Sequence, residues 1–241
     1  MMTGQNTPVF PPSSQALDEP NGLIAVGGDL SVSRLLAAYQ RGIFPWFEPG
    51  ESILWWTPDP RMVLFPHEFH CSKSLRKVLK KNTYRIAINT CFEQVMRACA
   101  SPRDDADGTW ISEEMVLAYT ELHRLGYAHS FECYQDDTLV GGLYGVKIGN
   151  IFFGESMFSL RSNSSKVAFT ALVSMAIASG VTLIDCQVAN AHLASLGARE
   201  IMRDQFEELL MQATHANIIA VTGSAATAWQ GALPPKTEAL L

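Results

Sequence analysis

Two short turns between strand-like segments constrain the fold of this chain most. Asp136-Asp137 and Gly149-Asn150 are dipeptides typical of the tight connections in β-hairpins. Connections of two residues join neighbouring antiparallel strands. We therefore expect a meander of three strands over residues 128–134, 138–148 and 151–157.

Helices are predicted on both sides of this meander. Ser112 is a candidate N-cap before Glu113 and Glu114, and Gly126 ends that helix. After the meander, residues 167–184 carry no charge, and we interpret them as a buried helix over 166–179 followed by a strand over 181–188, not as a membrane span. Further upstream we expect strands at 61–65 and 84–88 and helices at 31–41, 72–81 and 90–100. This order predicts an α+β fold with a mostly antiparallel sheet.

Aromatic residues and prolines alternate in the N-terminal quarter. Trp46, Trp55 and Trp56 lie within eleven residues, and prolines at 45, 49, 58 and 60 exclude a long helix or a central strand. The aromatic rings either stack on a base, a sugar or an apolar side chain, or form a minicore that clamps two lobes together. We expect a small N-terminal domain over residues 1–62 and a larger domain over 63–241, with a loose tail after about residue 222.

Composition indicates a globular protein of a reducing compartment. Apolar residues make up 47% of the chain, and the net charge of −6 argues against a protein that coats nucleic acid indiscriminately. The five cysteines are odd in number and contain no C-x-x-C pair, and the histidines lack paired ligand spacing. We therefore expect no disulfide framework and no metal site. Without a signal-peptide pattern or a membrane span, the expected location is the cytoplasm.

Three polar residues stand out within predicted strands. Asp185 and Gln187 are two apart, so both side chains point to one face of the strand and Cys186 points to the other. Such a pair must be hydrogen-bonded or face a cleft, so it either caps structure or orients a substrate. Glu155 lies among large apolar residues. It is either an edge-facing residue or a carboxylate that holds an ammonium or hydroxyl group beside an apolar pocket.

One predicted helix carries an uninterrupted stripe of cations. Its basic residues, at spacings of three and four, are Lys73, Arg76, Lys77, Lys80 and Lys81. Acidic residues are missing between Glu68 and Glu93. On a chain of negative net charge, this stripe indicates a phosphate-binding surface. The alternative is a helix face that is merely solvated.

Taken together, these segments resemble the bacterial leucyl/phenylalanyl-tRNA–protein transferase family. The matching motifs, in chain order, are EPNGLIAVGGDLS (19–31), AYQRGIFPWFEPGESILWWTPDPRMVL (38–64), GTWI (108–111), LVGGLYGV (139–146), GESMFS (154–159) and LIDCQVANAHLASLGA (183–198). The resemblance implies a small N-terminal domain packed on a C-terminal domain with the fold of GCN5-related N-acetyltransferases. It also implies transfer of Leu or Phe, less often Met, from aminoacyl-tRNA to proteins that begin with Arg or Lys. The products would be marked for N-end-rule degradation.

The resemblance also implies residue roles. Asp185, Gln187 and Glu155 fall on catalytic positions; Tyr39, Trp46 and Trp110 on aromatics at the tRNA 3′ end; Leu143, Phe152 and Met157 near the amino-acid pocket; and Lys80 and Lys81 in the basic tRNA-binding helix. Because an aminoacyl ester is already activated, aminoacyl-tRNA is a co-substrate, and no cofactor, metal or ATP is expected. We expect Asp185 or the ribose 2′-hydroxyl to move the proton of the attacking amine, and Gln187 to orient that amine.

Two other functions compete with this one. An acetyl-CoA-dependent N-acetyltransferase would need a glycine-rich pyrophosphate loop before the buried helix, but residues 159–164 contain no glycine. An RNA-binding module would use the basic helix and the aromatic loop, yet it leaves the Asp185–Gln187 pair without a role.

Overall fold

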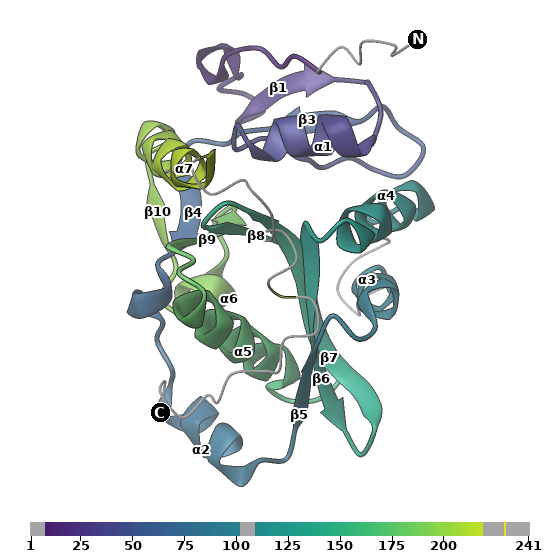
Figure 1. Ribbon diagram of the computed structural model, residues 1–241, viewed down its shortest axis with the longest axis vertical. Helices are drawn as coiled ribbons and strands as arrows, with labels where there is room; N and C mark the ends of the chain where they lie inside the picture. Colours follow the sequence, from purple (N-terminus) through teal and green to yellow (C-terminus); the bar gives the residue numbers. More distant parts are fainter. Residues whose placement is uncertain (1–7, 102–108, 219–228, 230–241) are drawn as a thin grey trace.

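The predicted meander lies within a larger sheet in the computed structural model, which describes residues 8–101, 109–218 and 229 (Figure 1). β6 (Ala128–Gln135), β7 (Thr138–Ile148) and β8 (Ile151–Ser159) pair as antiparallel neighbours. In the turn between β6 and β7, Asp136 and Asp137 both adopt positive φ, at 47° and 61°. Aspartate tolerates this left-handed region, which the tight hairpin turn requires. The predicted meander is confirmed.

Four more strands complete a seven-stranded sheet of order β10–β4–β9–β8–β7–β6–β5. The added strands are β4 (Arg61–Leu64), β5 (Arg85–Ile88), β9 (Leu183–Gln187) and β10 (Arg199–Ile201). Among the described strands of this sheet, only β8 and β9 pair in parallel. A parallel pair needs a crossover connection, and helix α5 (Ser164–Ala178) supplies it. The predicted α+β class with a mostly antiparallel sheet is confirmed.

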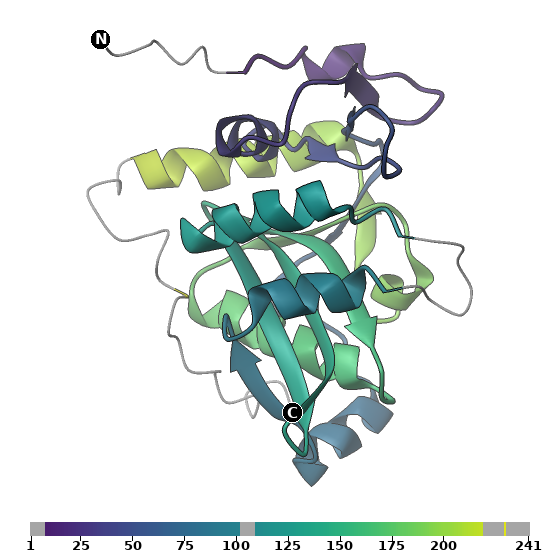
Figure 2. The same ribbon diagram turned by 90° about the vertical axis from the view of Figure 1, so that its right-hand side faces the viewer.

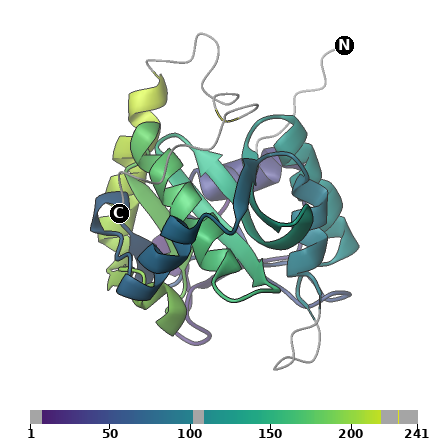
Figure 3. The ribbon, with the colours of Figure 1, turned by 90° about the horizontal axis from the view of Figure 1, so that it is seen from below.

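Helices cover both faces of this sheet (Figures 1 and 3). α5 packs on one face and is buried around most of its circumference, which explains the charge-free stretch. α3 (Phe92–Cys99) and α4 (Glu113–Arg124) lie across the opposite face (Figure 2). α2 (Lys73–Lys81) contacts α5. In the part of the chain that the structure describes, no helix is long and apolar enough to span a membrane.

The N-terminal part builds a second, small sheet of order β1–β3–β2. Its strands are β1 (Leu23–Val26), β2 (Phe44–Pro45) and β3 (Leu54–Trp56), and α1 (Val32–Tyr39) begins at the predicted cap Ser31. The prediction that the prolines exclude a central strand is wrong, because β3 is the middle strand. Only three residues long, it fits between Pro49 and Pro58, while Pro45 lies on an edge strand, where proline is tolerated.

The tryptophans of the aromatic loop have different surroundings. Trp55 is 1% exposed and packs edge-on against Phe10, at 5.0 Å between ring centroids. Phe44 and Phe47 are also buried. Trp46 by contrast is 44% exposed. The minicore interpretation therefore describes Trp55 and its buried neighbours, and the interpretation of open aromatic faces describes Trp46.

The small sheet shares one apolar core with the large sheet, and that core includes Tyr39, Phe44, Tyr144 and Phe153. α7 (Arg203–Ile218) closes the junction between the two sheets, and its Phe206 ring lies 2.6 Å from the position that a Cβ on Gly42 would take.

The proposed domain boundary at residue 62 falls within β4. The shortest helical elements described are α6 (Ala191–Ala194) and the 3₁₀ turns η1 (Ser13–Gln15) and η2 (Pro66–Glu68). Most of the predicted loose tail lies outside the described residues.

Candidate active site

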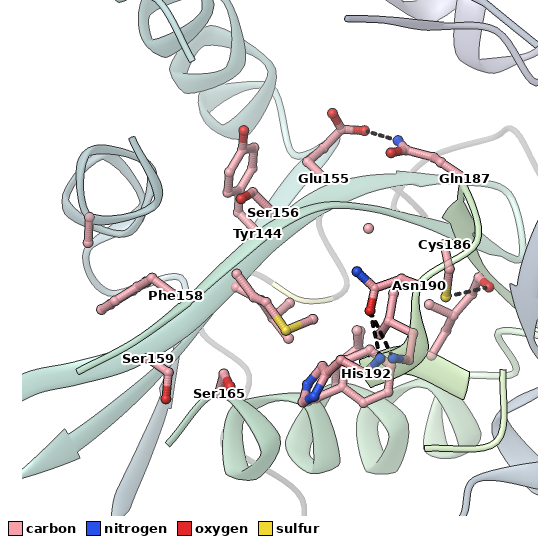
Figure 4. A pocket seen from close by; sticks show the side chains of 18 of the residues that line it. Tyr144, Glu155, Ser156, Phe158, Ser159, Ser165, Cys186, Gln187, Asn190 and His192 are labelled. Atoms are coloured by element: carbon pink, nitrogen blue, oxygen red, sulfur yellow. Dashed lines mark hydrogen bonds between the residues drawn. The ribbon is translucent and has the colours of Figure 1, made fainter. Parts of the chain in front are cut away.

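A pocket of about 760 Å³ opens where β8 and β9 part (Figure 4). The parallel pairing ends at Phe153 and Asp185, and the residues that follow on both strands line the gap. Gly154 stands at this point, where a Cβ would be 3.4 Å from the Asp185 carbonyl oxygen. Divergence of two neighbouring strands thus creates the cavity and places polar residues at its edge.

Glu155 is the centre of a hydrogen-bond network at this edge. Its Oε1 accepts hydrogen bonds from Gln187 Nε2 at 3.1 Å and from the Tyr39 hydroxyl at 2.8 Å, and its Oε2 accepts one from the Tyr119 hydroxyl at 3.3 Å. The Tyr39 and Tyr119 hydroxyls also contact each other. Burial raises the pKa of Glu155 to about 7, against the hydrogen bond from Tyr39, which lowers it. A carboxyl that changes charge near neutral pH can exchange a proton with a substrate.

Asp185 has a different environment, although it lies on the neighbouring strand. Both its oxygens are held by Arg61, at 2.8 Å from Nε and 2.7 Å from Nη2, and both side chains are fully buried. The guanidinium carbon lies 4.9 Å from the Phe44 ring centroid and 4.6 Å from that of Phe206. Arg61 therefore joins β9 to the small sheet and to α7.

This ion pair also fixes the end of β9. The backbone N–H of Gln187 donates to Asp185 Oδ1 at 3.0 Å, and Gln187 has a φ of 65°. Positive φ is unfavourable for a glutamine, so surrounding interactions must hold it. With its oxygens occupied by Arg61 and the Gln187 N–H, Asp185 is suited to orienting the strand end. This geometry does not favour the expected role of Asp185 in moving a proton.

The pocket has an apolar wall and a polar rim. Apolar lining side chains come from β7, β8, β9 and α5: Leu143, Met157, Phe158, Ile184, Phe169 and Leu172. The polar rim includes Ser156, Asn190 and His192 (Figure 4). Burial lowers the pKa of His192, and the nearby Lys166 adds to this effect. The histidine is thus biased towards the neutral imidazole, which accepts and donates hydrogen bonds.

The structure brings six of the predicted site residues together at the pocket. Those that line the pocket are Glu155, Asp185, Gln187, Trp110, Leu143 and Met157. Tyr39 is buried behind Glu155, and Trp46 packs on Trp56 away from the pocket lining, at 6.1 Å between ring centroids. Phe152 is not a lining residue either. It precedes the point where β8 and β9 part, so its ring is covered by the core.

The predicted cationic stripe lies on α2, beside α5. All five side chains are exposed: Lys73, Arg76, Lys77, Lys80 and Lys81. Leu75 is buried, and Val78 and Leu79 pack partly against the core beneath. Across the described ranges, no group of three or more His, Cys, Asp and Glu side chains is placed to hold a metal ion.

Two site residues were missed from sequence. Arg61 stands in the TPDPR motif, but a lone arginine after two prolines gives no sign that it is buried. Tyr119 lies on the apolar face of α4 and looks like an ordinary core residue. Their partners are distant in sequence, since Arg61 and Asp185 are 124 residues apart and Tyr119 and Glu155 are 36 residues apart. A pairing of this kind leaves no local pattern.

The chain is similar to known proteins over most of its length. The sequence profile described as leucyl/phenylalanyl-tRNA protein transferase matches residues 63–211, and the profile of that family's N-terminal domain matches residues 28–59. The leucyl/phenylalanyl-tRNA–protein transferase of Cellvibrio japonicus is 60% identical over 205 residues, which cover 85% of this chain and 87% of that protein. The protein of the same name from Chromobacterium violaceum is 61% identical over 199 residues, covering 83% and 85%.

Among solved structures, a GCN5-related N-acetyltransferase from Kribbella flavida matches with 12% identity and a TM-score of 0.36, covering 70% of this chain and 60% of that one. Because that TM-score is low, we draw the family assignment from the sequence matches. The profiles span most of both sheets, and the relatives cover more than four fifths of the chain. This chain therefore belongs to the leucyl/phenylalanyl-tRNA–protein transferase family.

Proposed function

We propose that this protein transfers Leu or Phe, and less often Met, from aminoacyl-tRNA to the α-amine of proteins that begin with Arg or Lys. The observation that carries the proposal is an apolar pocket with Glu155 and Gln187 hydrogen-bonded to each other at its edge, in a chain of this family. In the reaction, the amine nitrogen bonds to the ester carbonyl carbon and the bond to the tRNA 3′-oxygen breaks. The amine loses a proton, and the 3′-oxygen gains one.

The apolar wall supports the choice of amino acid. Leu143 and Met157 would contact the side chain of the aminoacyl group, with Ile184 and Leu172 deeper in the pocket. Apolar side chains that are unbranched at Cβ, such as Leu, Phe and Met, suit a deep pocket of this kind. Ile and Val, which are branched at Cβ, would be disfavoured by shape, by about 10–200-fold, which is the range over which apolar pockets separate near-isosteres.

Glu155 is the best-placed group to take the proton of the attacking amine. Its pKa is raised to about 7 by burial, so a useful fraction is ionised at neutral pH. Gln187 would orient the amine and Glu155 through its side-chain amide. Asp185 then acts as a positioning carboxylate, held by Arg61. Positioning an amine against an activated ester can supply roughly 7–11 kcal/mol of the barrier, so no cofactor or metal is required.

The tRNA would be held at two places. The five exposed cations of α2 would bind phosphates of the tRNA backbone. Binding through such contacts depends on salt, because each neutralised phosphate releases counterions. Trp110 lines the pocket, and its ring would stack on the 3′ terminal base. Trp46, with its exposed ring, would contact the acceptor end outside the pocket. Tyr39 acts on the substrate only through Glu155.

The acceptor protein would approach the Glu155 edge of the pocket. A negative net charge of −6 suits a partner whose first residue is Arg or Lys. The product would be marked for degradation by the N-end rule, in the cytoplasm. Acetyl-CoA transfer is disfavoured, because the turn before α5 lacks glycine, and a passive RNA-binding role leaves the buried network of Glu155 without a purpose.

Transfer of radiolabelled Leu from leucyl-tRNA to a peptide with N-terminal Arg tests the proposal. We expect labelled peptide from leucyl-tRNA and phenylalanyl-tRNA, at least about tenfold less from isoleucyl-tRNA, and none with an otherwise identical peptide that begins with Glu. Acetyl-CoA serves as the competing donor. Acetylation without aminoacyl transfer, or equal transfer of Ile and Leu, would overturn the proposal.

A further inference from the structure

Trp229 lies beyond the residues that the family profiles match, yet it is buried in the larger domain. Only 1% of its surface is exposed. Its ring stacks on Phe152, with centroids 5.7 Å apart and planes 24° apart, and it meets Phe131 edge-on at 5.7 Å and 85°. Such contacts are specific in distance and angle, so this residue fills a defined place in the core.

Polar contacts fix the same residue on the sheet. The Trp229 carbonyl oxygen accepts a hydrogen bond from Asn89 Nδ2 at 2.8 Å. Asn89 Oδ1 in turn accepts from the backbone N–H of Ser130 at 3.0 Å. The Lys147 Nζ lies 5.9 Å from the indole centroid, within the range of a cation–π contact. Trp229 is therefore attached to β6, to β7 and to the end of β5.

The two phenylalanines that Trp229 contacts lie beside residues of the pocket wall. Phe131 is the cross-strand partner of Leu143, and Phe152 is the partner of Ile184, and cross-strand partners lie side by side on one face of a sheet. Leu143 and Ile184 line the pocket, whereas the two phenylalanines do not. Gly145 leaves room for the Phe152 ring, since a Cβ there would lie 2.6 Å from it. The phenylalanine pair therefore links Trp229 to residues that line the pocket.

We infer that Trp229 is a positioning residue that sets the depth of the amino-acid pocket through Phe152 and Phe131. The inference rests on the proposed function, which assigns the pocket to the aminoacyl side chain. Protein interiors are close-packed, so a void behind one layer lets that layer retreat. Without the indole, Phe152 gains space to move away from Ile184, and the pocket becomes deeper. A deeper pocket fits Phe better and Leu worse.

The test measures kcat/KM for Leu and Phe separately, in the full-length protein with matched leucyl-tRNA and phenylalanyl-tRNA. For Trp229→Ala we expect the ratio of Phe to Leu transfer to rise by about tenfold, at the lower end of what apolar pockets discriminate. Trp229→Leu fills part of the volume, so its ratio of Phe to Leu transfer should lie between those of the native protein and Trp229→Ala. If the alanine variant does not fold, the ratio in Trp229→Leu tests the inference. Leu122→Ala, which truncates a buried residue of α4, is the matched control for lost packing.

The outcomes separate this inference from the proposed function. A purely structural role for Trp229 would lower both transfers by the same factor, as Leu122→Ala should, and an unchanged ratio would overturn the inference. Met157→Ala alters the pocket wall directly. If Met157→Ala shifts the ratio and the Trp229 variants do not, the pocket assignment stands and the inference fails. If none of them shifts the ratio, the assignment of the pocket fails, and the inference fails with it.

Discussion

Two carboxylates on neighbouring strands, Glu155 of β8 and Asp185 of β9, have opposite surroundings. Glu155 is held by two tyrosine hydroxyls and an amide, and burial raises its pKa to about 7. Asp185 is held by a guanidinium in a fully buried ion pair. The neutral donors around Glu155 leave its carboxyl able to gain a proton near neutral pH, whereas both oxygens of Asp185 are occupied by a bidentate guanidinium. The nearest partners of each carboxylate, and not its residue type or its motif, therefore determine which role it is suited to.

The largest expected effect is on the rate of transfer, and it tests whether Glu155 acts as the base. Glu155→Gln keeps the shape of the side chain and removes the base, so kcat for aminoacyl transfer should fall by about 10²–10⁴-fold. Single-turnover transfer at saturating leucyl-tRNA measures it. Thermal melting of the same samples is the control and should be close to native. Full turnover by folded Glu155→Gln protein would remove Glu155 from proton transfer.

Arg61→Ala tests how strongly the buried ion pair of Arg61 and Asp185 stabilises the fold. It leaves a buried carboxylate without its partner, and breaking a buried pair in this way costs about 3–5 kcal/mol of unfolding free energy. Urea unfolding measures the loss. The double variant Arg61→Met with Asp185→Leu removes both charges and should recover most of the stability. A loss of less than about 1 kcal/mol in the single variant, the size typical of exposed pairs, would contradict the buried pair.

The pH dependence of catalysis sharpens the difference. Glu155 must be ionised to accept a proton, and its pKa is about 7, so kcat should fall about tenfold per pH unit below 7. The same raised pKa means that the folded state binds the proton more tightly than the unfolded chain. Stability from Glu155 is therefore present below its ordinary value of 4.5 and lost as the pH rises through about 7. In Glu155→Gln both dependences should flatten. A flat native profile would refute this assignment.

The smallest effect concerns the cations of α2, which lie outside both networks. Lys80→Ala with Lys81→Ala should raise KM for aminoacyl-tRNA and make the log–log salt slope shallower by about one to two units, at roughly 0.7–0.9 per lost phosphate contact. The kcat and the KM for the acceptor peptide should barely change. An unaltered slope would show that these lysines form a solvated face and do not meet tRNA.

Local chemistry explains why much of the fold is predictable. The turn dipeptides, the cap Ser112 and the charge-free stretch of α5 act over a few residues. The elements that were predicted begin and end within about two residues of the observed ones, whereas β1, β2, β3, β10, α6 and α7 were not predicted. The site was found in part for the same reason. Alternation along β9 places Asp185 and Gln187 on one face, whichever sheet the strand joins.

The partners of these residues were decided by the tertiary structure alone. The sequence by itself determined where strands, turns and helices form, and which side chains a strand presents together. Only the folded chain decided that Arg61 meets Asp185, that Tyr39 and Tyr119 meet Glu155, and that Phe152 lies beside the lining residue Ile184 and outside the pocket lining. Secondary structure follows from interactions between near neighbours. Burial, and with it the pKa of Glu155, depends on contacts between residues far apart in the chain, which no local pattern records.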